Sequence, residues 1–486
     1  LMFGHGQVFT IPDIDHTDYM LMLGANPAAS NGSLMSSGDV LKRLEGIEAR
    51  GGKWVLVDPR KTESSLYASE HQFIRPGTDP LFVAGLIQHI IQNELYNPDH
   101  LLPMMDGFDQ LLSLFDDFDI NDISEQCGIP VSKIQQIASE FAAADSAICY
   151  GRMGVSTQNF STLNHWLMNV LNILTGNLDR RGGMMFTNPA VDFSLKANTA
   201  GSYEEYHSRV RGLPEFNREF PASILAEEIL TPGQGQIKAF VCIAGNPALS
   251  TPNSRQVDEA LEQLDFMVSL DFYLNETSRH ADIILPPTGP LEHEQFDLVF
   301  NLLAVRNVAK FAEPLFEHNE DTRSDWDILN GLLERINALK GVKPKKNAAP
   351  DLSLEQMLDF GLKGGPYGKA YQQHQGEEVI SHPHGLSLKE LKKYPHGLDL
   401  GPLQPRLPNH LFTHNQKIQL LPQQVLSDFN TMQTHFAALR ESNSFMLIGR
   451  RDLRTNNSWM HNSQRLVKGK DRCALFINPQ DAFRLG

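Results

Sequence analysis

Apolar runs alternate with segments of helical periodicity in the first part of the chain. The run "YMLMLG" at 19–24 predicts a strand, and Val40, Leu44 and Ile47 then share one face of a helix that stops at Gly51. Strands that alternate with helices predict a parallel sheet covered by helices on both faces. The other elements expected here are strands at 53–60 and 145–155 and helices at 79–95 and 162–176.

The same alternation begins again at Ile237. A strand is expected at 237–245, followed by a helix at 254–264 and by strands at 265–273 and 281–288. The next stretch is rich in Gly, Pro and His and predicts a long connector with short helices. The final part contains the apolar runs "KIQLLP", "SFMLIGR" and "CALFINP", which predict a β-rich segment. The pattern therefore predicts two α/β units, a connector and a β-rich end.

One stretch of eight residues occurs twice, once in each α/β unit. In "LGANPAAS" and "IAGNPALS" the Asn-Pro pairs that start at Asn26 and Asn246 stand in register, each after a strand and before a helix. The next strand of each unit ends on an acid, Asp58 in the first unit and Asp271 in the second. The two units therefore repeat a turn and an acid in the same order.

The chemistry of this repeat suits a nucleotide. Small residues let a phosphate approach the backbone, and a helix N-terminus offers unpaired N–H donors. An acid at the end of the neighbouring strand can accept hydrogen bonds from ribose hydroxyls or from a base N–H. The repeat thus predicts two Rossmann-like nucleotide-binding domains with one tail each. In the alternative, each Asn-Pro caps a helix and the acids are solvated turn residues.

The overall composition argues against several classes of protein. A formal net charge of −16 argues against a nucleic-acid-binding surface, and no apolar run is long enough to span a bilayer. The four cysteines have no paired spacing, so neither a disulfide framework nor a zinc or iron–sulfur motif is expected within this chain. Cys242 lies in an apolar run and is interpreted as a buried thiol, in a protein of the reducing cytoplasm.

Six motifs follow one another along the chain: "GANPAAS", "VDPRKT", "RPGTD", "LTGN", "AGNPALS" and "NETSRHADIILPPT". As an ordered set they resemble the molybdopterin oxidoreductases of the dimethyl-sulfoxide-reductase type, which include formate dehydrogenases and nitrate reductases. The resemblance implies a molybdenum or tungsten atom between two pterins, each with a guanine nucleotide tail. It also implies nucleotide-binding domains at 1–155 and 156–340, a connector at 341–410, and the start of a cofactor-binding β-barrel domain at 411–486.

The resemblance further implies which residues bind the cofactor. The first nucleotide site would be lined by Gly24, Asn26, Asp58, Arg60, Gly77 and Asp79. The second would be lined by Gly245, Asn246, Asp271, Thr277 and Asp282. Near the pterins would lie Met153, Gly154 and His293. A C-terminal segment that resembles the one crossing the cofactor would add Arg450, Arg454, Asn457 and His461, although it also fits a surface loop of a β domain.

Two features depart from the family pattern. Family members usually carry a Cys, selenocysteine, Ser or Asp metal ligand upstream of the first turn, often after a 4Fe–4S segment, and this chain is expected to begin after both. Where formate dehydrogenases have a substrate-binding Arg, this chain has Trp166, preceded by His165. An Arg fork suits a carboxylate and an indole does not, so formate is not the expected substrate. His165 is the candidate for proton transfer, and Trp166 also fits a simple helix core.

The expected function is that of a bis-molybdopterin guanine dinucleotide oxidoreductase acting on a small molecule, with the redox partner unknown. The chain alone is expected to fold without activity, and a homodimer is a candidate assembly. Two other classes remain open. One is a non-catalytic structural relative, such as the large subunit of complex I, and the other is a different nucleotide-binding α/β protein.

Overall fold

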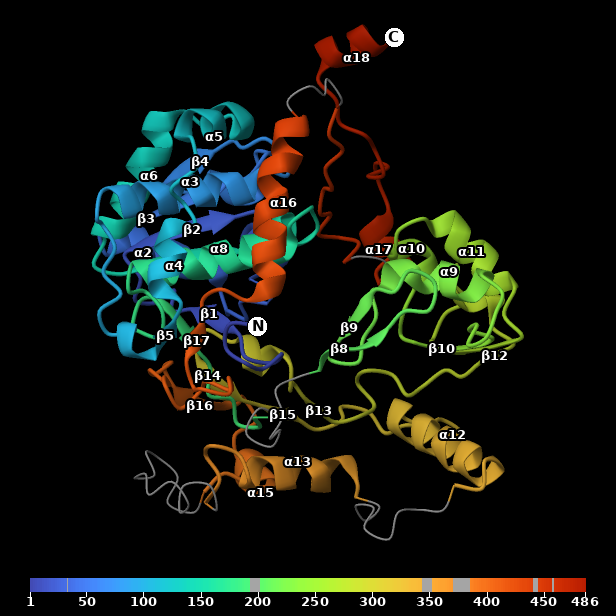
Figure 1. Ribbon diagram of the computed structural model, residues 1–486. Helices are drawn as coiled ribbons and strands as arrows, with labels where there is room; N and C mark the ends of the chain where they lie inside the picture. Colours follow the sequence, from blue (N-terminus) through green and yellow to red (C-terminus); the bar gives the residue numbers. More distant parts are fainter. Residues whose placement is uncertain (33, 193–201, 343–351, 370–384, 440–444, 457–458) are drawn as a thin grey trace.

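The first α/β unit is built on a four-stranded parallel sheet. The computed structural model describes residues 1–486 except 33, 193–201, 343–351, 370–384, 440–444 and 457–458 (Figure 1). The sheet has the order β4-β3-β2-β6. Its strands are β2 (Tyr19–Leu23), β3 (Lys53–Val57), β4 (Glu70–Gln72) and β6 (Ala147–Gly151). Every side chain of β2 is buried, as a parallel sheet covered on both faces requires.

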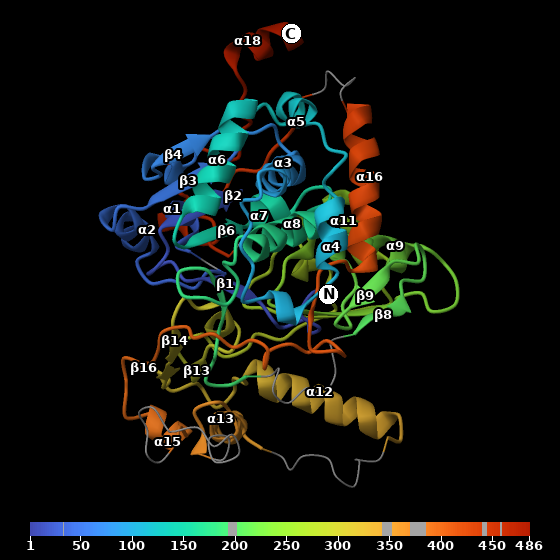
Figure 2. The ribbon, with the colours of Figure 1, turned by 60° about the vertical axis from the view of Figure 1, so that its left-hand side comes forward.

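Helices cover both faces of this sheet. α2 (Val40–Ala49) contacts β3, while α3 (Asp79–Gln92), α6 (Val131–Ala143) and α8 (Ser161–Leu174) form a second group in which α3 contacts both α6 and α8. Figure 2 shows α2 on the opposite side of the sheet from α3 and α8. Because β3 lies on one side of β2 and β6 on the other, the strand order reverses at β2. Ligands of such sheets bind beyond the carboxyl ends of the strands at this reversal.

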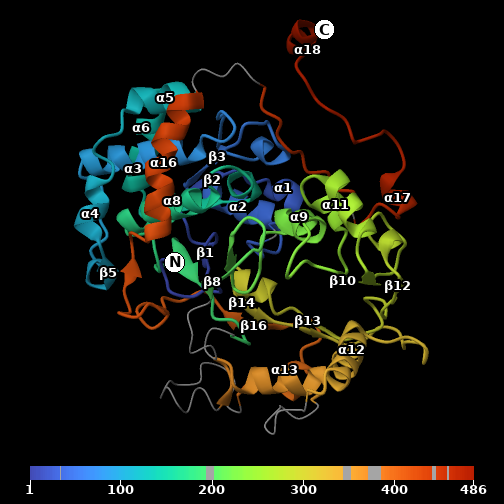
Figure 3. The same cartoon turned by 45° about the vertical axis from the view of Figure 1, so that its right-hand side comes forward.

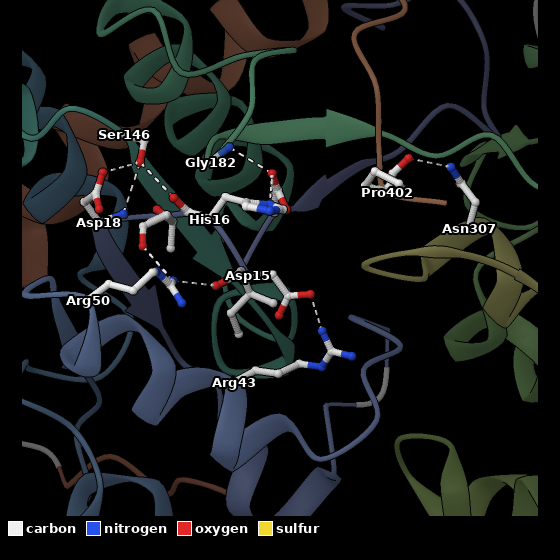
Figure 4. A network of polar contacts seen from close by, with 12 residues as sticks. Asp15, His16, Asp18, Arg43, Arg50, Ser146, Gly182, Asn307 and Pro402 are labelled. Atoms are coloured by element: carbon white, nitrogen blue, oxygen red, sulfur yellow. Dashed lines mark hydrogen bonds and ion pairs between the residues drawn. The ribbon is translucent and has the colours of Figure 1, made fainter. Parts of the chain in front are cut away.

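Hydrogen bonds connect residues 14–18, which precede β2, to the rest of the first unit (Figure 4). The Arg50 guanidinium donates to the carbonyl oxygens of Ile14 and Thr17, over 3.1 and 3.0 Å. The Ser146 hydroxyl donates to the carboxylate of Asp18 over 2.8 Å. Asp18 and Ser146 immediately precede β2 and β6, so this network lies at the amino ends of the strands. It stabilises the edge of the sheet opposite the one where a ligand is expected.

The second unit is a smaller parallel sheet with helices on one face. Its order is β10-β11-β12, with β10 (Ala239–Ile243), β11 (Phe266–Leu270) and β12 (Ile283–Ile284). α9 (Leu225–Leu230) and α11 (Ser254–Glu262) contribute to a core that includes Cys242. The buried position of Cys242 confirms its interpretation as a core thiol. The prediction of an α/β fold with parallel sheets is confirmed as well.

The other face of this second sheet is exposed along its two outer strands, β10 and β12, in the described part of the chain. Val241, Ile243 and Ile283 project from it with 50%, 48% and 45% of their surfaces exposed. The helix α12 (Asp325–Leu339) follows this sheet in the chain and has no buried residue. We refer to the surface formed by Val241, Ile243 and Ile283 as the bare face. The second unit therefore buries less apolar surface than the first.

The carboxyl-terminal part differs from the expected β-rich segment. The short strand β17 (Ile418–Gln419) pairs with β5 (Met105–Asp106), and the helix α16 (Gln423–Leu439) follows it. The described residues 445–450 and 473–478 form no strand. Leu447 and Phe476 in these runs are 84% and 71% exposed, and no strand among the described residues pairs with either run. An apolar run forms a strand only where a partner accepts its backbone hydrogen bonds.

The remaining elements are short. The further strands are β1 (Thr10–Pro12), β7 (Met184–Phe186), β8 (Tyr203–His207), β9 (Pro214–Phe216), β13 (Gln295–Phe296), β14 (Asn307–Ala309), β15 (Phe311–Ala312) and β16 (Leu398–Gly401). The further helices are α1 (Pro27–Ser30), α4 (Phe108–Ser113), α5 (Ile120–Cys127), α7 (Met153–Ser156), α10 (Pro247–Ser250), α13 (Leu354–Lys363), α15 (Leu388–Leu391), α17 (Gln464–Val467) and α18 (Pro479–Leu485). Among the described residues, no helix has the length and apolarity that crossing a membrane requires.

Candidate functional site

The two Asn-Pro turns have the same conformation. Each follows the first strand of its sheet along the chain, β2 in one unit and β10 in the other, and each leads into a single helical turn, α1 or α10. The backbone angles are φ −132° and ψ 71° at Asn26, and φ −127° and ψ 65° at Asn246. The sequence repeat is therefore also a repeat of backbone geometry.

A set of side-chain hydrogen bonds closes the first turn. The Asn26 amide nitrogen donates to a Glu63 carboxylate oxygen over 2.7 Å. The Asn26 amide oxygen accepts from the Ser64 hydroxyl over 2.7 Å and from the Ser64 backbone N–H over 3.2 Å. The Ser64 hydroxyl in turn accepts from the Ala28 N–H over 3.0 Å. We call this set the first Asn clasp.

The second turn is closed in the same way. The Asn246 amide nitrogen donates to Glu276 over 2.9 Å, and its amide oxygen accepts from the Thr277 hydroxyl over 2.7 Å. That hydroxyl accepts from the Ala248 N–H over 3.0 Å. This second Asn clasp occupies both polar atoms of the Asn246 amide. The Asn side chains therefore shape their turns, and other groups are left to face a ligand.

The clasp partners were not among the predicted site residues, apart from Thr277. Glu63 and Ser64 lie in "TESS" at 62–65, and Glu276 lies in "NETS" at 275–278. Both tetrapeptides follow the strand after the Asn-Pro turn, so they are a second repeat that accompanies the first. This second repeat is the sequence signal from which the clasp partners could have been predicted, since Glu and then Ser or Thr occupy matching positions in both tetrapeptides.

The two strand-end acids also match each other. Asp58 follows β3 and accepts from the Arg60 N–H over 2.9 Å, and Asp271 follows β11 and accepts from the Tyr273 N–H over 3.0 Å. Asp58 is 9% exposed, and burial raises the pKa of its carboxyl. Each acid lies at the carboxyl end of a strand next to the one that carries the Asn-Pro turn. The structure thus places both predicted acids where they could accept hydrogen bonds from a ligand.

The end of β6 closely approaches the first turn. The Gly154 N–H donates to the Gly24 carbonyl oxygen over 2.9 Å. A Cβ on Gly24 would lie 2.7 Å from the Gly154 Cα, and Gly24 has a φ of +54°. Both observations require glycine at position 24. Gly24, Gly154 and the exposed Met153 are therefore brought together at the reversal of the strand order.

Asp79 is the most deeply buried acid of the first site. It begins α3 after Gly77, is 5% exposed, and accepts from the Gln158 amide nitrogen over 3.0 Å. Burial raises the pKa of Asp79 to about 6, against the lowering effect of that hydrogen bond. The Gln158 amide oxygen is buried without a hydrogen-bond partner in the described residues. Asp79 and Gln158 thus present an acceptor and an unused polar atom beside Gly77.

The C-terminal segment spans both units. Figures 1 and 3 show it running from α16, beside the first unit, to α17, which lies beside α10 and α11. The pKa of Glu63 is lowered by the hydrogen bond from Asn26 and also by the charge of Arg450. The pKa of Glu276 is lowered by the hydrogen bond from Asn246 and also by His461. The segment therefore brings one basic side chain towards each Asn clasp.

His165 and Trp166 on α8 have different surroundings. The Nε2 atom of His165 lies 2.9 Å from the Ser156 hydroxyl, and burial, with the charge of Arg152, lowers the pKa of the imidazole. Trp166 is 3% exposed, and its indole N–H donates to the Leu420 carbonyl oxygen over 2.7 Å. Its ring also stacks on Phe115, with centroids 6.4 Å apart. This arrangement favours the helix-core interpretation of Trp166.

Some predicted site residues lie elsewhere. Asp282 precedes β12, and its carboxylate accepts from the Met267 N–H at the amino-terminal part of β11, so its placement at the second turn is wrong. His293 bonds to the carbonyl oxygen of the adjacent Glu294. Arg454 is exposed, and Asn457 lies outside the described residues. Parallel strands separate Asp282 from Asp271, because the start and the end of a strand face opposite edges of the sheet.

Comparisons with known proteins agree with this geometry. A family model described as "Molybdopterin oxidoreductase" matches residues 2–335. The assimilatory nitrate reductase catalytic subunit of Bacillus subtilis is 30% identical over 311 residues, which are 60% of this chain and 43% of the relative. Formate dehydrogenase H of Escherichia coli is 25% identical over 409 residues, or 78% of this chain and 55% of the relative. The chain thus spans about half the length of these curated relatives.

A solved structure shares the fold. Acetylene hydratase from Pelobacter acetylenicus matches with a TM-score of 0.67 over 95% of this chain and 66% of that chain. At 17% identity this likeness concerns the fold alone. The family model covers well over half of the chain, and the two Asn-Pro turns lie within it. The resemblance inferred from the motifs is confirmed, and this chain belongs to the molybdopterin oxidoreductase family.

Proposed function

We propose that this chain forms most of the cofactor-binding body of a molybdenum or tungsten oxidoreductase with two molybdopterin guanine dinucleotides. The observation that carries the proposal is the pair of matching Asn clasps, each beside a strand-end acid. Two equivalent sites suit two equivalent ligands, and in this proposal each Rossmann-like unit holds one guanine nucleotide tail. The bound cofactor would supply two-electron redox or oxygen-atom-transfer chemistry.

The residues that line the two sites fit such a ligand. Asp58 and Asp271 have carboxylate oxygens that can accept hydrogen bonds from ribose hydroxyls or from guanine N–H groups. Asp79, with Gln158, offers further acceptors in the first unit. Guanidinium groups such as that of Arg450 suit the diphosphate of the tail. These donors and acceptors hold and orient the tails, and the chain's own contribution to the reaction lies in that positioning.

Proton transfer falls to His165 in this proposal. Its lowered pKa leaves the imidazole neutral near pH 7, so it can accept a proton from a small substrate bound beside it. The hydroxyl of Ser156 orients the imidazole through the contact at Nε2. We further propose that the whole protein acts in the cytoplasm and has a 4Fe–4S cluster and a metal ligand in sequence beyond this chain. A homodimer is its proposed assembly.

Loss of a strand-end acid tests the two-tail proposal. Asp58→Ala and Asp271→Ala each remove a charge-assisted hydrogen bond worth about 1.5–3 kcal/mol, so each should release one tail roughly 10- to 150-fold more readily. Guanine nucleotide set free on denaturation is counted per chain in the full-length protein. Asp265→Ala is the matched control, because that side chain is 65% exposed and forms a surface ion pair with Lys238. Metal-loaded wild type without guanine nucleotide would refute the proposal of two guanine nucleotide tails.

The substrate is proposed to be a small molecule other than formate. Trp166 stands where formate dehydrogenases have an Arg, and the loss of that partner should cost about 2–5 kcal/mol of transition-state binding. The corresponding rate decrease is roughly 30- to 5,000-fold. Steady-state assays of the full-length enzyme with formate and an artificial electron acceptor measure this rate. Turnover at the rate of formate dehydrogenases would contradict the argument.

A further inference from the structure

Arg152 stands at the reversal of the strand order in the first sheet. It directly follows β6, and β6 lies next to β2, which carries the first Asn-Pro turn. The main chain of Arg152 is held in place, since its N–H donates to the Leu23 carbonyl oxygen over 3.2 Å and its carbonyl oxygen accepts from the Ser156 hydroxyl over 3.1 Å. This residue is therefore fixed at the point where sheets of this kind bind ligands.

The guanidinium of Arg152 has no counter-charge in the described part of the chain. The side chain is half-buried, and its guanidinium takes part in no hydrogen bond or ion pair among the described residues. A buried cation without a partner is costly, and proteins generally pair such groups. The five N–H donors of this guanidinium are thus free for a ligand in a site whose backbone is already ordered.

A neighbouring arginine adds to the positive charge of Arg152. Burial lowers the pKa of Arg152, and the positive charge of Arg451 lowers it further. Arg152 in turn lowers the pKa of His165, and Tyr150, which is neutral at pH 7, is the other titratable neighbour. The positive charge of Arg451, from the C-terminal segment, therefore adds to that of Arg152 at the end of β6, and such a positive field attracts anions.

The cavity beside Arg152 is too small to hold an anion. Arg152 lines it together with Tyr150 and three residues of the first turn, Ala25, Pro27 and Ser30. Its volume of 10 Å³ is room for about one water molecule, and a phosphate group does not fit inside. An anion bound by Arg152 would therefore lie outside this cavity.

We propose that Arg152 is the principal residue of an oxyanion-binding site at the end of β6. A guanidinium fork matches the oxygens of phosphate-like groups and binds them in a bidentate way. Two sources share this chemistry, the diphosphate of a nucleotide tail and a small oxyanion substrate. The inference rests on the proposed function for its physiological ligand, whereas the anion site itself is a property of this chain.

Binding of inorganic anions to the cofactor-free chain tests the site. The 486-residue chain, purified from a host that makes no molybdopterin, is titrated by calorimetry with inorganic pyrophosphate and, separately, with nitrate. Arg152→Gln should weaken binding of the preferred anion 10- to 100-fold, and Arg152→Lys should restore part of it, since the charge remains without the fork. The control is Arg255→Gln, whose side chain is 90% exposed and pairs with Glu259. It should bind like the wild type.

The outcomes separate the two sources and the two proposals. Arg152-dependent binding of pyrophosphate assigns the site to the nucleotide tail, and Arg152-dependent binding of nitrate alone assigns it to a small oxyanion. Equal binding by wild type and Arg152→Gln, or binding of neither anion, would overturn the site. Guanine nucleotide is also counted in both proteins from a molybdopterin-producing host. Its absence from the wild type, together with Arg152-dependent pyrophosphate binding, would refute the proposed function and leave the anion site standing.

Discussion

Replacement of Asn26 by alanine should loosen the first turn without affecting the second. Asn26→Ala removes three hydrogen bonds, one to Glu63 and two from Ser64. Each contributes about 0.5–1.5 kcal/mol, and the exposure of Glu63 puts its bond at the low end of this range. The local opening free energy should therefore fall by about 2 kcal/mol, which corresponds to roughly 30-fold faster opening.

Native-state amide exchange measures this opening directly. Peptides that contain Ala28 and Ser64 should exchange about 30-fold faster in Asn26→Ala, while peptides around Thr277 should keep the wild-type rate. Asn246→Ala is the matched variant and should reverse this pattern. A double-mutant cycle of Asn26→Ala with Glu63→Ala should show a coupling free energy of about 0.5–1 kcal/mol, because the two side chains share a hydrogen bond. If the two substitutions changed the opening free energy additively, or if exchange became faster in both units, the clasp would not be a local stabilising interaction.

Three further predictions concern the first unit. Asp79 has a folded pKa of about 6, above its unfolded value of 3.8, so the folded state holds the proton more tightly. Stability should fall by about 3 kcal/mol as pH rises from about 4 to 6, and urea titrations of Asp79→Asn should lack this component. Gly24→Ala should cost several kcal/mol more than Gly128→Ala, because both sites have positive φ but only Gly24 meets another backbone within 4 Å; thermal denaturation measures the difference. Trp166→Ala should cost about 3–5 kcal/mol and expose α16 to limited proteolysis, whereas Trp166→Phe should keep most of the packing.

The sequence pattern predicted β2, β3 and β6 of the first sheet and the three strands of the second from their apolar runs. It missed β4, because Glu70–Gln72 is a short polar segment without such a run. It also located the two turns, since the Asn-Pro pairs and the strand-end acids recur at matching places. The partners of the clasp were harder to find. Glu63 bonds to a residue 37 positions away, and local periodicity carries no information on such pairs. A comparison of "TESS" with "NETS" would have revealed them.

The β-rich end shows a different limit. Apolar alternation near Leu447 and Phe476 is typical of strands, but a strand also needs a neighbour, and the described chain provides none there. The prediction that Asp282 lies at the second turn was wrong for a related reason. Its motif indicates a strand, and only the parallel register shows which edge of the sheet the acid occupies.

The bare face has a consequence for cooperativity. The core of the first unit joins strands, helices and α16 in one buried cluster, whereas the core of the second unit is a separate and smaller cluster on one side of its sheet. A unit that buries little apolar surface unfolds at a lower free energy than its neighbour. Heating should therefore produce two calorimetric transitions, with β10–β12 melting first. A single melting temperature would then not describe this chain, and a ligand that bridges both units would merge the two transitions into one.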